Sequence, residues 1–291
     1  MNGLFDAYVI IDWSASSVPK TGADSIWIAI VARDGRILDL ANPPTRAAAW
    51  AFVADRLADL IAQGRRVLAG MDFPLGYPEG TARRLGLGGP PWRATWDRLA
   101  AGLIDGPDNR NNRFALAADL NHHLTGHPTP FWSCPPSAQS PCLGPRKPAL
   151  SVLPEWRATE RRVRGVQPIW KLYTTGSVGS QALTGIPRLR AWREAPRLAP
   201  AAAVWPFETG FRPPEAPLIF AEVWPSLLKD AWKAHHPVKD AGQVLALAGH
   251  LAALDAADRL APLFAGPPDL TAAEAQAAGT EEGWILSWKP P

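Results

Sequence analysis

Four acidic residues stand where the sequence predicts regular elements to end or begin. Asp12, Asp72 and Glu222 each end an apolar run, and Asp240 lies at the start of a long helical pattern. Functional groups of open α/β sheets gather where strands end, and carboxylates brought together there need a cation to stay ionised. Oxygen ligands suit Mg²⁺ or Mn²⁺, and two such ions can activate water and stabilise the leaving oxygen of a phosphodiester. We therefore expect Asp12 and Asp72 to bridge metal ions, Asp240 to complete a second site, and Glu222 to bind metal or position water.

Each acid also has a purely structural interpretation. Asp12 and Asp72 are typical of residues that begin turns. Asp240 in the first turn of a helix interacts favourably with the helix dipole without any catalytic duty. Glu222 can equally pair with a lysine further along the chain, such as Lys229. The convergence of all four acids at one edge favours the chemical interpretation over these alternatives.

The loop after Asp12 supplies candidate substrate ligands. Ser14, Ser16 and Lys20 offer hydroxyls and an ammonium group that can contact a phosphate. No glycine-rich phosphate-binding pattern accompanies them, so an ordinary polar loop is the alternative interpretation.

A second candidate for substrate contact is a basic stretch near the middle of the chain. It is interleaved with Trp156 and Trp170, a mixture that suits phosphate neutralisation and base stacking on nucleic acid. Of its members, Arg161 and Arg162 are the predicted contacts, although a charged run is commonly only a solvated face. The basic residues are Arg146, Lys147, Arg157, Arg161, Arg162 and Arg164.

The elements that must position these acids are predicted from apolar periodicity. The sequence predicts strands over 6–12, 26–32 and 36–40, a helix over 45–63, and a strand over 66–72. Short links, one of them an Asp-Gly turn, favour antiparallel pairing of the first three strands. The helix has Thr45 as a possible N-cap and is followed by Gly64.

Residues 77–200 are rich in proline and tryptophan and interrupt this regular pattern. The chain contains 31 prolines and 14 tryptophans, and the clustered prolines disfavour long helices and central strands. We predict an insertion with short helices over 92–103 and 113–123, followed by a helix over 181–194.

The remaining sequence returns to regular elements. It predicts strands over 201–207 and 217–223 and a helix over 238–260, whose apolar positions recur at helical spacing. Residues 269–282 are acidic and rich in alanine, so we expect 265–291 to form a solvated C-terminal segment. Residues 1–291 are expected to form a single domain.

Four short blocks resemble a known family. They look like those of the family called domain of unknown function 429, which is described as a predicted nuclease family with the ribonuclease H-like fold. The resemblance implies a mixed sheet of three antiparallel strands, then a helix, then parallel strands, elaborated here by the Pro/Trp-rich insertion. It also implies metal-binding acids at Asp12, Asp72 and Asp240 and a matching strand-end glutamate at Glu222. The blocks are Ile10-Ile11-Asp12-Trp13-Ser14, Gly70-Met71-Asp72-Phe73-Pro74-Leu75-Gly76, Glu222-Val223-Trp224-Pro225-Ser226 and Lys239-Asp240-Ala241.

Composition limits the alternatives. A chain of 291 residues that is 47% hydrophobic can bury a full core, and a net charge of +3 favours no particular partner. Two cysteines and an N-terminus without a signal-peptide or membrane-span pattern indicate a cytoplasmic protein. The leading prediction is a Mg²⁺- or Mn²⁺-dependent nuclease. A protein that binds a nucleotide or another phosphorylated metabolite and a non-catalytic scaffold remain open, and nucleic acid or a nucleotide is the expected partner.

Overall fold

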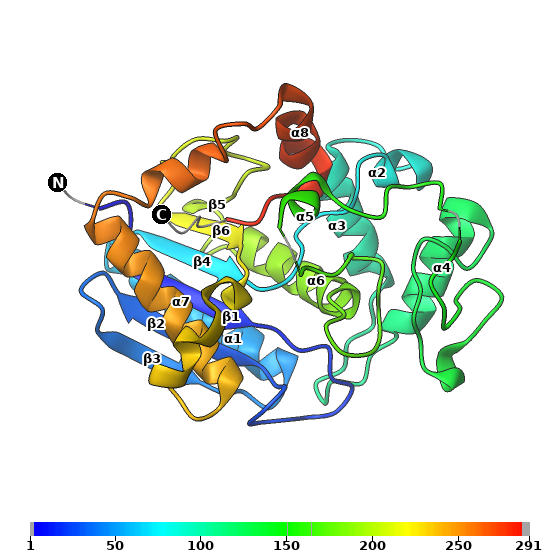
Figure 1. Cartoon of the computed structure of the whole chain (residues 1–291). Coiled ribbons are helices and arrows are strands. Elements are labelled where there is room, and N and C mark those ends of the chain that lie inside the picture. The colour runs from blue at the N-terminus through cyan, green and yellow to red at the C-terminus, as the bar shows by residue number, and fades with distance from the viewer. Residues whose placement is uncertain (1–2, 150, 164, 287–291) are drawn as a thin grey trace.

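Apolar runs from both ends of the chain form one six-stranded mixed sheet (Figure 1). The structure is a computed structural model that describes residues 3–149, 151–163 and 165–286. In space the strands follow the order β3-β2-β1-β4-β6-β5. β1, β2 and β3 are antiparallel neighbours, whereas β4, β6 and β5 run parallel to β1. Their bounds are β1 Ala7–Asp12, β2 Trp27–Ala32, β3 Ile37–Ala41, β4 Val67–Met71, β5 Ala202–Val204 and β6 Leu218–Glu222.

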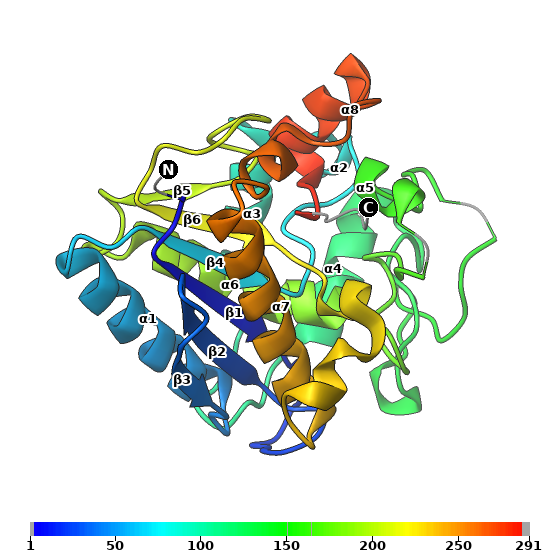
Figure 2. The same ribbon diagram turned by 60° about the vertical axis from the view of Figure 1, so that its left-hand side comes forward.

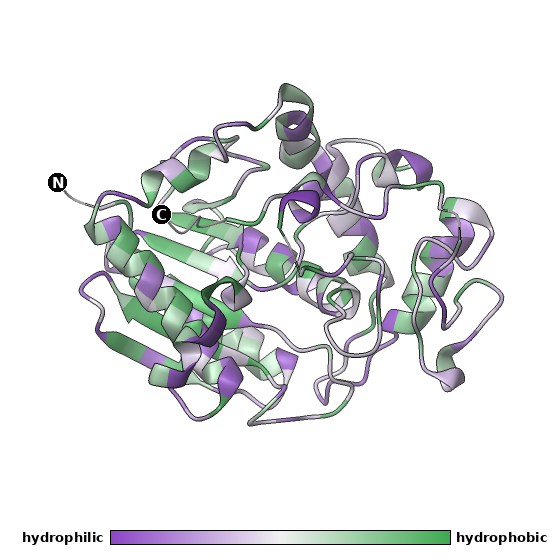
Figure 3. Ribbon diagram, viewed as in Figure 1, coloured by the Kyte–Doolittle hydropathy of each residue, from purple (hydrophilic) through white to green (hydrophobic). Residues whose placement is uncertain are grey.

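The central strands are buried on both faces, as their continuous apolar sequences predict. In β1, Val9 and Ile11 contribute to one hydrophobic cluster, while Tyr8 and Ile10 contribute to the cluster on the opposite face. This alternation follows from the two-residue period of a strand. Figure 3 shows the resulting hydrophobic colouring of the central strands. The predicted mixed α/β sheet is therefore confirmed.

Helices cover both faces of the sheet (Figure 2). Helix α7 packs across β1 and β2, and α1 lies against the opposite face with α6 beside it. The predicted N-cap of α1 is confirmed, because the Thr45 hydroxyl accepts the N–H of Ala48. The bounds of the α-helices are α1 Arg46–Ala62, α2 Thr81–Arg84, α3 Pro91–Gly102, α4 Arg113–Thr125, α5 Ala158–Arg162, α6 Gly179–Glu194, α7 Lys239–Ala256 and α8 Ala272–Ala277. None of the helices in the described residues is long and apolar enough to cross a membrane.

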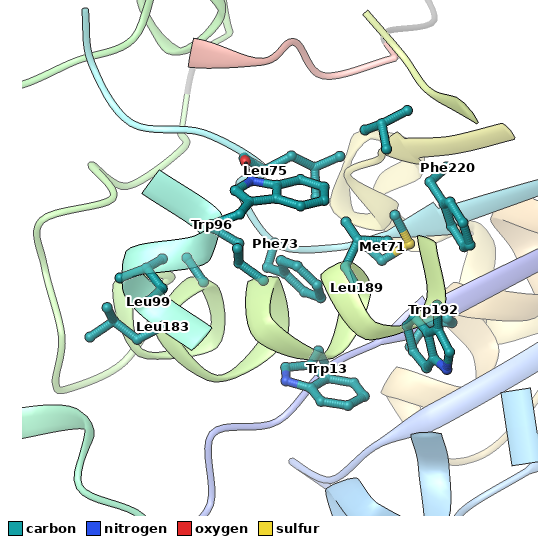
Figure 4. Close-up of a cluster of buried hydrophobic side chains, with 14 of the residues drawn as sticks. Trp13, Met71, Phe73, Leu75, Trp96, Leu99, Leu183, Leu189, Trp192 and Phe220 are labelled. Carbon is teal, nitrogen blue, oxygen red and sulfur yellow. Dashed lines mark hydrogen bonds between the residues drawn. The ribbon is translucent and has the colours of Figure 1, made fainter. Parts of the chain in front are cut away.

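Helix α6 belongs to the core although it lies within the 77–200 excursion. Its Trp192 packs edge-on against Trp13, with ring centroids 6.1 Å apart. Its Gly185 lies so close to Phe73 that an added Cβ would stand 2.5 Å from the ring. Figure 4 shows this cluster, in which α6 side chains point toward residues that follow β1 and β4. The packing therefore places the middle and last turn of α6 against the residues that follow these two strands.

The expectation of a solvated C-terminal segment is wrong for residues 281–286. Glu281 and Glu282 are only 4% and 3% exposed, because their carboxylates accept backbone N–H groups. Glu281 bonds the amides of residues 80 and 82, and Glu282 bonds those of residues 79 and 158. The chain then runs beside β6, where Leu286 N–H donates to Glu222 O. Acidic composition suggested solvent exposure, but these acids cap buried turns instead.

Candidate functional site

The ends of β1 and β4 bring Asp12 and Asp72 together. The two strands are parallel neighbours with Ile11 opposite Met71, and Asp72 N–H donates to Ile11 O over 3.1 Å. The carboxyl groups of Asp12 and Asp72 are hydrogen-bonded to each other. Asp72 Oδ1 also accepts the N–H of Trp13 at 2.8 Å. The predicted meeting of these two acids is therefore present in the structure.

Close packing of these carboxyl groups perturbs their titration. Burial, together with the neighbouring charge of Asp72, raises the pKa of Asp12 well above its ordinary value. Burial likewise raises the pKa of Asp72 to about 7, against the lowering effect of its hydrogen bonds. The pair therefore holds a proton to a higher pH than two isolated aspartates would, because burial and mutual repulsion disfavour the doubly ionised state.

Asp240 lies close enough to raise the pKa values of Asp12 and Asp72, but its carboxylate is hydrogen-bonded to a backbone amide. It occupies the first turn of α7, and its Oδ2 accepts the N–H of Asp24 at 2.6 Å. Burial raises the pKa of Asp240, and its charge in turn raises those of Asp12 and Asp72. Within the described residues, no three His, Cys, Asp or Glu side chains are arranged to hold a metal ion as they stand.

Glu222 reaches the same region but is tied to an arginine. Both of its carboxylate oxygens accept from Arg157, at 2.6 and 2.7 Å, and Oε2 also accepts the N–H of Leu75. Arg157 further pairs with Glu160 at 2.8 Å, and all three charged side chains are buried. The sequence-based alternative of a salt bridge was therefore right in kind, but the partner is Arg157 and not Lys229.

A cleft of about 790 Å³ joins these groups to the loops around them. Ser14, Ser16 and Lys20 line it, as predicted. The two serines are engaged locally, because Ser16 Oγ donates to Val18 O and Ser14 Oγ accepts the N–H of Ser16. Lys20 forms an exposed ion pair with Asp24 at 3.6 Å. The loop is thus near the acids while already satisfying part of its own polar groups.

The predicted basic contacts lie elsewhere. Arg162 pairs with Asp269 at 3.0 Å and with Glu274 at 2.7 Å, and Arg161 donates to the carbonyl of Trp156. Neither arginine lines the cleft. Lys147 and Arg157 of the same stretch are also paired with carboxylates, while Arg164 lies outside the described residues. Much of this stretch is therefore neutralised by the protein itself.

Residues that the sequence did not single out also line the cleft. Arg113 at the start of α4 lines the cleft, as do Tyr173 and Gln181. Gln181, in the first turn of α6, donates to Trp13 O at 2.6 Å. The only sequence signal for Arg113 and Gln181 was their position at the first turns of predicted helices. That signal does not distinguish a cleft residue from any other helix start.

Comparisons of the sequence with protein-family models, with curated proteins and with solved structures return no match.

Proposed function

We propose that the cleft binds Mg²⁺ or Mn²⁺ and hydrolyses a phosphodiester. The observation that carries this proposal is the hydrogen-bonded Asp12 and Asp72 carboxyl pair at one end of a cleft of about 790 Å³. Paired acids with strongly raised pKa values are characteristic of functional sites. Asp240 adds a third carboxylate within electrostatic reach.

The strand arrangement supports the accompanying proposal of a ribonuclease H-like fold. Three antiparallel strands are followed by α1 and then by strands parallel to β1, which is the order that the family resemblance implies. Asp12, Asp72 and Asp240 stand at the first strand, the fourth strand and the last long helix. We accordingly propose membership of the domain of unknown function 429 family. Because fold alone does not fix activity, the reaction rests on the carboxyl pair and not on this likeness.

The donor set of the cleft fits a hard divalent cation. Its candidate ligands are carboxylate oxygens, which Mg²⁺ and Mn²⁺ prefer, and their mutual repulsion is what a bound cation would relieve. Asp12 and Asp72 would hold the ion directly, and Asp240 would join after releasing the Asp24 amide. When bound, the ion would keep the carboxylates ionised and stabilise charge on the phosphate oxygens.

Hydrolysis then requires transfer of one proton from the attacking water and cleavage of one phosphorus–oxygen ester bond. A water oxygen bonds to phosphorus while the bond from phosphorus to the leaving oxygen breaks. The carboxyl pair accepts the proton that the water loses, and the leaving oxygen takes up a proton from solvent.

Titration with Mn²⁺ tests the proposal. Wild type should bind Mn²⁺ and hydrolyse bis-p-nitrophenyl phosphate, while Asp12→Asn and Asp72→Asn should lose both properties. Asp230→Asn is the matched control, because Asp230 is 78% exposed and pairs with Lys233 on the surface. Mn²⁺ binding that is the same in wild type, Asp12→Asn and Asp72→Asn would overturn the proposal.

A nucleotide-binding protein without hydrolytic activity is the second candidate. It is favoured by the ion pair between Arg157 and Glu222, because a carboxylate held by an arginine is not free to bind a metal ion or position water. Stabilisation by a nucleotide with no turnover in the presence of Mn²⁺ would select this candidate.

A further inference from the structure

Arg113 is a cation of the cleft without a carboxylate partner among the described residues. Its Nε donates to Ser180 Oγ at 3.0 Å, and its Nη1 donates to Ser17 Oγ and Asn111 Oδ1 at 2.7 and 2.9 Å. The other arginine of the cleft, Arg157, is fully paired with two glutamates. Arg113 is therefore fixed in position by neutral groups while its charge is left uncompensated.

The acid whose charge acts on Arg113 is Asp105, which forms ion pairs with two other arginines. Asp105 raises the pKa of Arg113 from a distance, but its carboxylate pairs with Arg46 at 2.5 Å and Arg188 at 3.0 Å. Burial and the charge of Arg46 lower the pKa of Arg113 to about 10. The guanidinium is still protonated at neutral pH. An anion that enters the cleft can therefore form charge-assisted hydrogen bonds with the Arg113 guanidinium.

Arg113 and the acid pair are linked by a short chain of contacts. Trp13 N–H donates to Asp72, and Trp13 O accepts from Gln181. Ser180, the neighbour of Gln181, accepts from Arg113. The carboxyl pair therefore contacts Trp13 directly, and the guanidinium is connected to the same residue through Ser180 and Gln181. The acid pair and Arg113 also line the same cleft.

An aromatic ring stands beside the cation. Tyr173 lines the cleft, is 44% exposed, and meets Phe114 edge-on with ring centroids 6.3 Å apart. Arg113 lies over the same Phe114 ring at 4.4 Å. An exposed tyrosine next to an arginine offers a stacking surface for a flat base attached to a phosphate.

We propose that Arg113 binds the phosphate of a nucleoside phosphate and that Tyr173 stacks on its base. This inference rests on the proposed function and specifies its ligand class: a single strand contains the phosphodiester that would be hydrolysed, whereas a free nucleoside monophosphate would bind without turnover. The ligand is either a free nucleotide or the phosphorylated end of a single strand, which present the same chemistry. A long duplex is disfavoured, because the basic residues Lys147, Arg157 and Arg162 are paired with the protein's own carboxylates.

Calorimetric titrations without metal separate this inference from the proposed hydrolysis. The probes are inorganic phosphate, AMP and a short 5′-phosphorylated single strand. Wild type should bind AMP or the single strand more tightly than phosphate. Asp12→Asn should keep this binding even though it loses Mn²⁺ binding and turnover, so failure of one proposal does not imply failure of the other.

Substitutions at the two residues give distinct expected results. Arg113→Gln should weaken binding of every probe by roughly tenfold to a hundredfold, whereas Arg113→Lys should retain part of it. Tyr173→Ala should reduce nucleotide affinity to that of phosphate, and Tyr173→Phe should preserve the difference. Arg110→Gln is the matched control, since the Arg110 side chain is 85% exposed and pairs with Asp108.

The outcomes decide the inference and the source of the ligand. Preference for AMP supports a free nucleotide, and preference for the phosphorylated strand supports a strand end. Wild-type affinities in a folded Arg113→Gln variant overturn the phosphate assignment. An unchanged preference for the nucleotide in Tyr173→Ala overturns the stacking assignment, and absence of binding by all three probes overturns both.

Discussion

The acid pair should make the metal-free protein less stable as the pH rises. Burial raises the pKa of Asp72 from 3.8 to about 7, so the folded protein keeps a proton that the unfolded chain releases above about pH 4. The stabilisation by this proton is fully present below the unfolded pKa. It is lost as the pH rises through the pKa of the folded state. The metal-free protein is therefore less stable at neutral pH than at acidic pH.

The size of this effect follows from the pKa difference. A rise of about three pKa units, at about 1.4 kcal/mol each, sets an upper limit of about 4 kcal/mol. Asp72 is only partly shielded from solvent and stands in a cleft that water can enter, which screens the repulsion. We therefore expect Asp72→Asn to stabilise the metal-free protein by about 2 kcal/mol above pH 7, and by nearly nothing below pH 4.

Urea unfolding in a chelator at both pH values measures this difference. Asparagine keeps an oxygen for the Trp13 N–H and an amide for Asp12, so the change removes charge with little loss of hydrogen bonding. Saturating Mn²⁺ should stabilise wild type but not Asp72→Asn. The control Asp230→Asn should differ from wild type by less than about 0.5 kcal/mol. A folded Asp72→Asn variant that is no more stable than wild type at neutral pH refutes the repulsion argument.

Three further substitutions probe the frame of the cleft by urea unfolding. Arg157→Met should cost about 3 to 5 kcal/mol at neutral pH, because it leaves Glu222 buried without a cation; a loss below about 1 kcal/mol would contradict this. Gly185→Ala should cost about 1 to 3 kcal/mol, since its Cβ would stand 2.5 Å from Phe73, and an unchanged midpoint would show that α6 can shift freely. Asp255→Ala should cost about 2 to 4 kcal/mol by removing the acceptor of two backbone amides and a tyrosine hydroxyl, an expectation that wild-type stability would disprove.

The sheet could be predicted because its sequence signals are local. Continuous apolar runs gave β1, β4 and β6 to within one or two residues, and an Asp-Gly turn gave the hairpin of β2 and β3. Placement of Asp12 and Asp72 at one edge followed, since parallel neighbouring strands end on the same side. In this case the pattern of each strand contained the information that positions its terminal acid.

The partners of buried charges could not be predicted in the same way. Arg157 and Glu222 are 65 positions apart, and nothing in the basic stretch marks one arginine as buried. Glu281 and Glu282 sit in an acidic, alanine-rich segment, yet they accept amides from turns some 200 residues earlier. Such pairings depend on how distant segments dock, a property that local composition does not encode.

The proposed cation and the proposed phosphate would strengthen each other's binding. Asp12, Asp72, Asp240 and Arg113 all line the cleft, and Arg113 has no carboxylate partner among the described residues. A phosphate drawn to Arg113 meets repulsion from any ionised acid, and a divalent cation at these acids turns this repulsion into attraction. Because coupling between two ligands is reciprocal, a phosphate held by Arg113 must increase cation affinity by the same factor. The raised pKa values of Asp12 and Asp72 reflect the same repulsion that a bound cation would relieve.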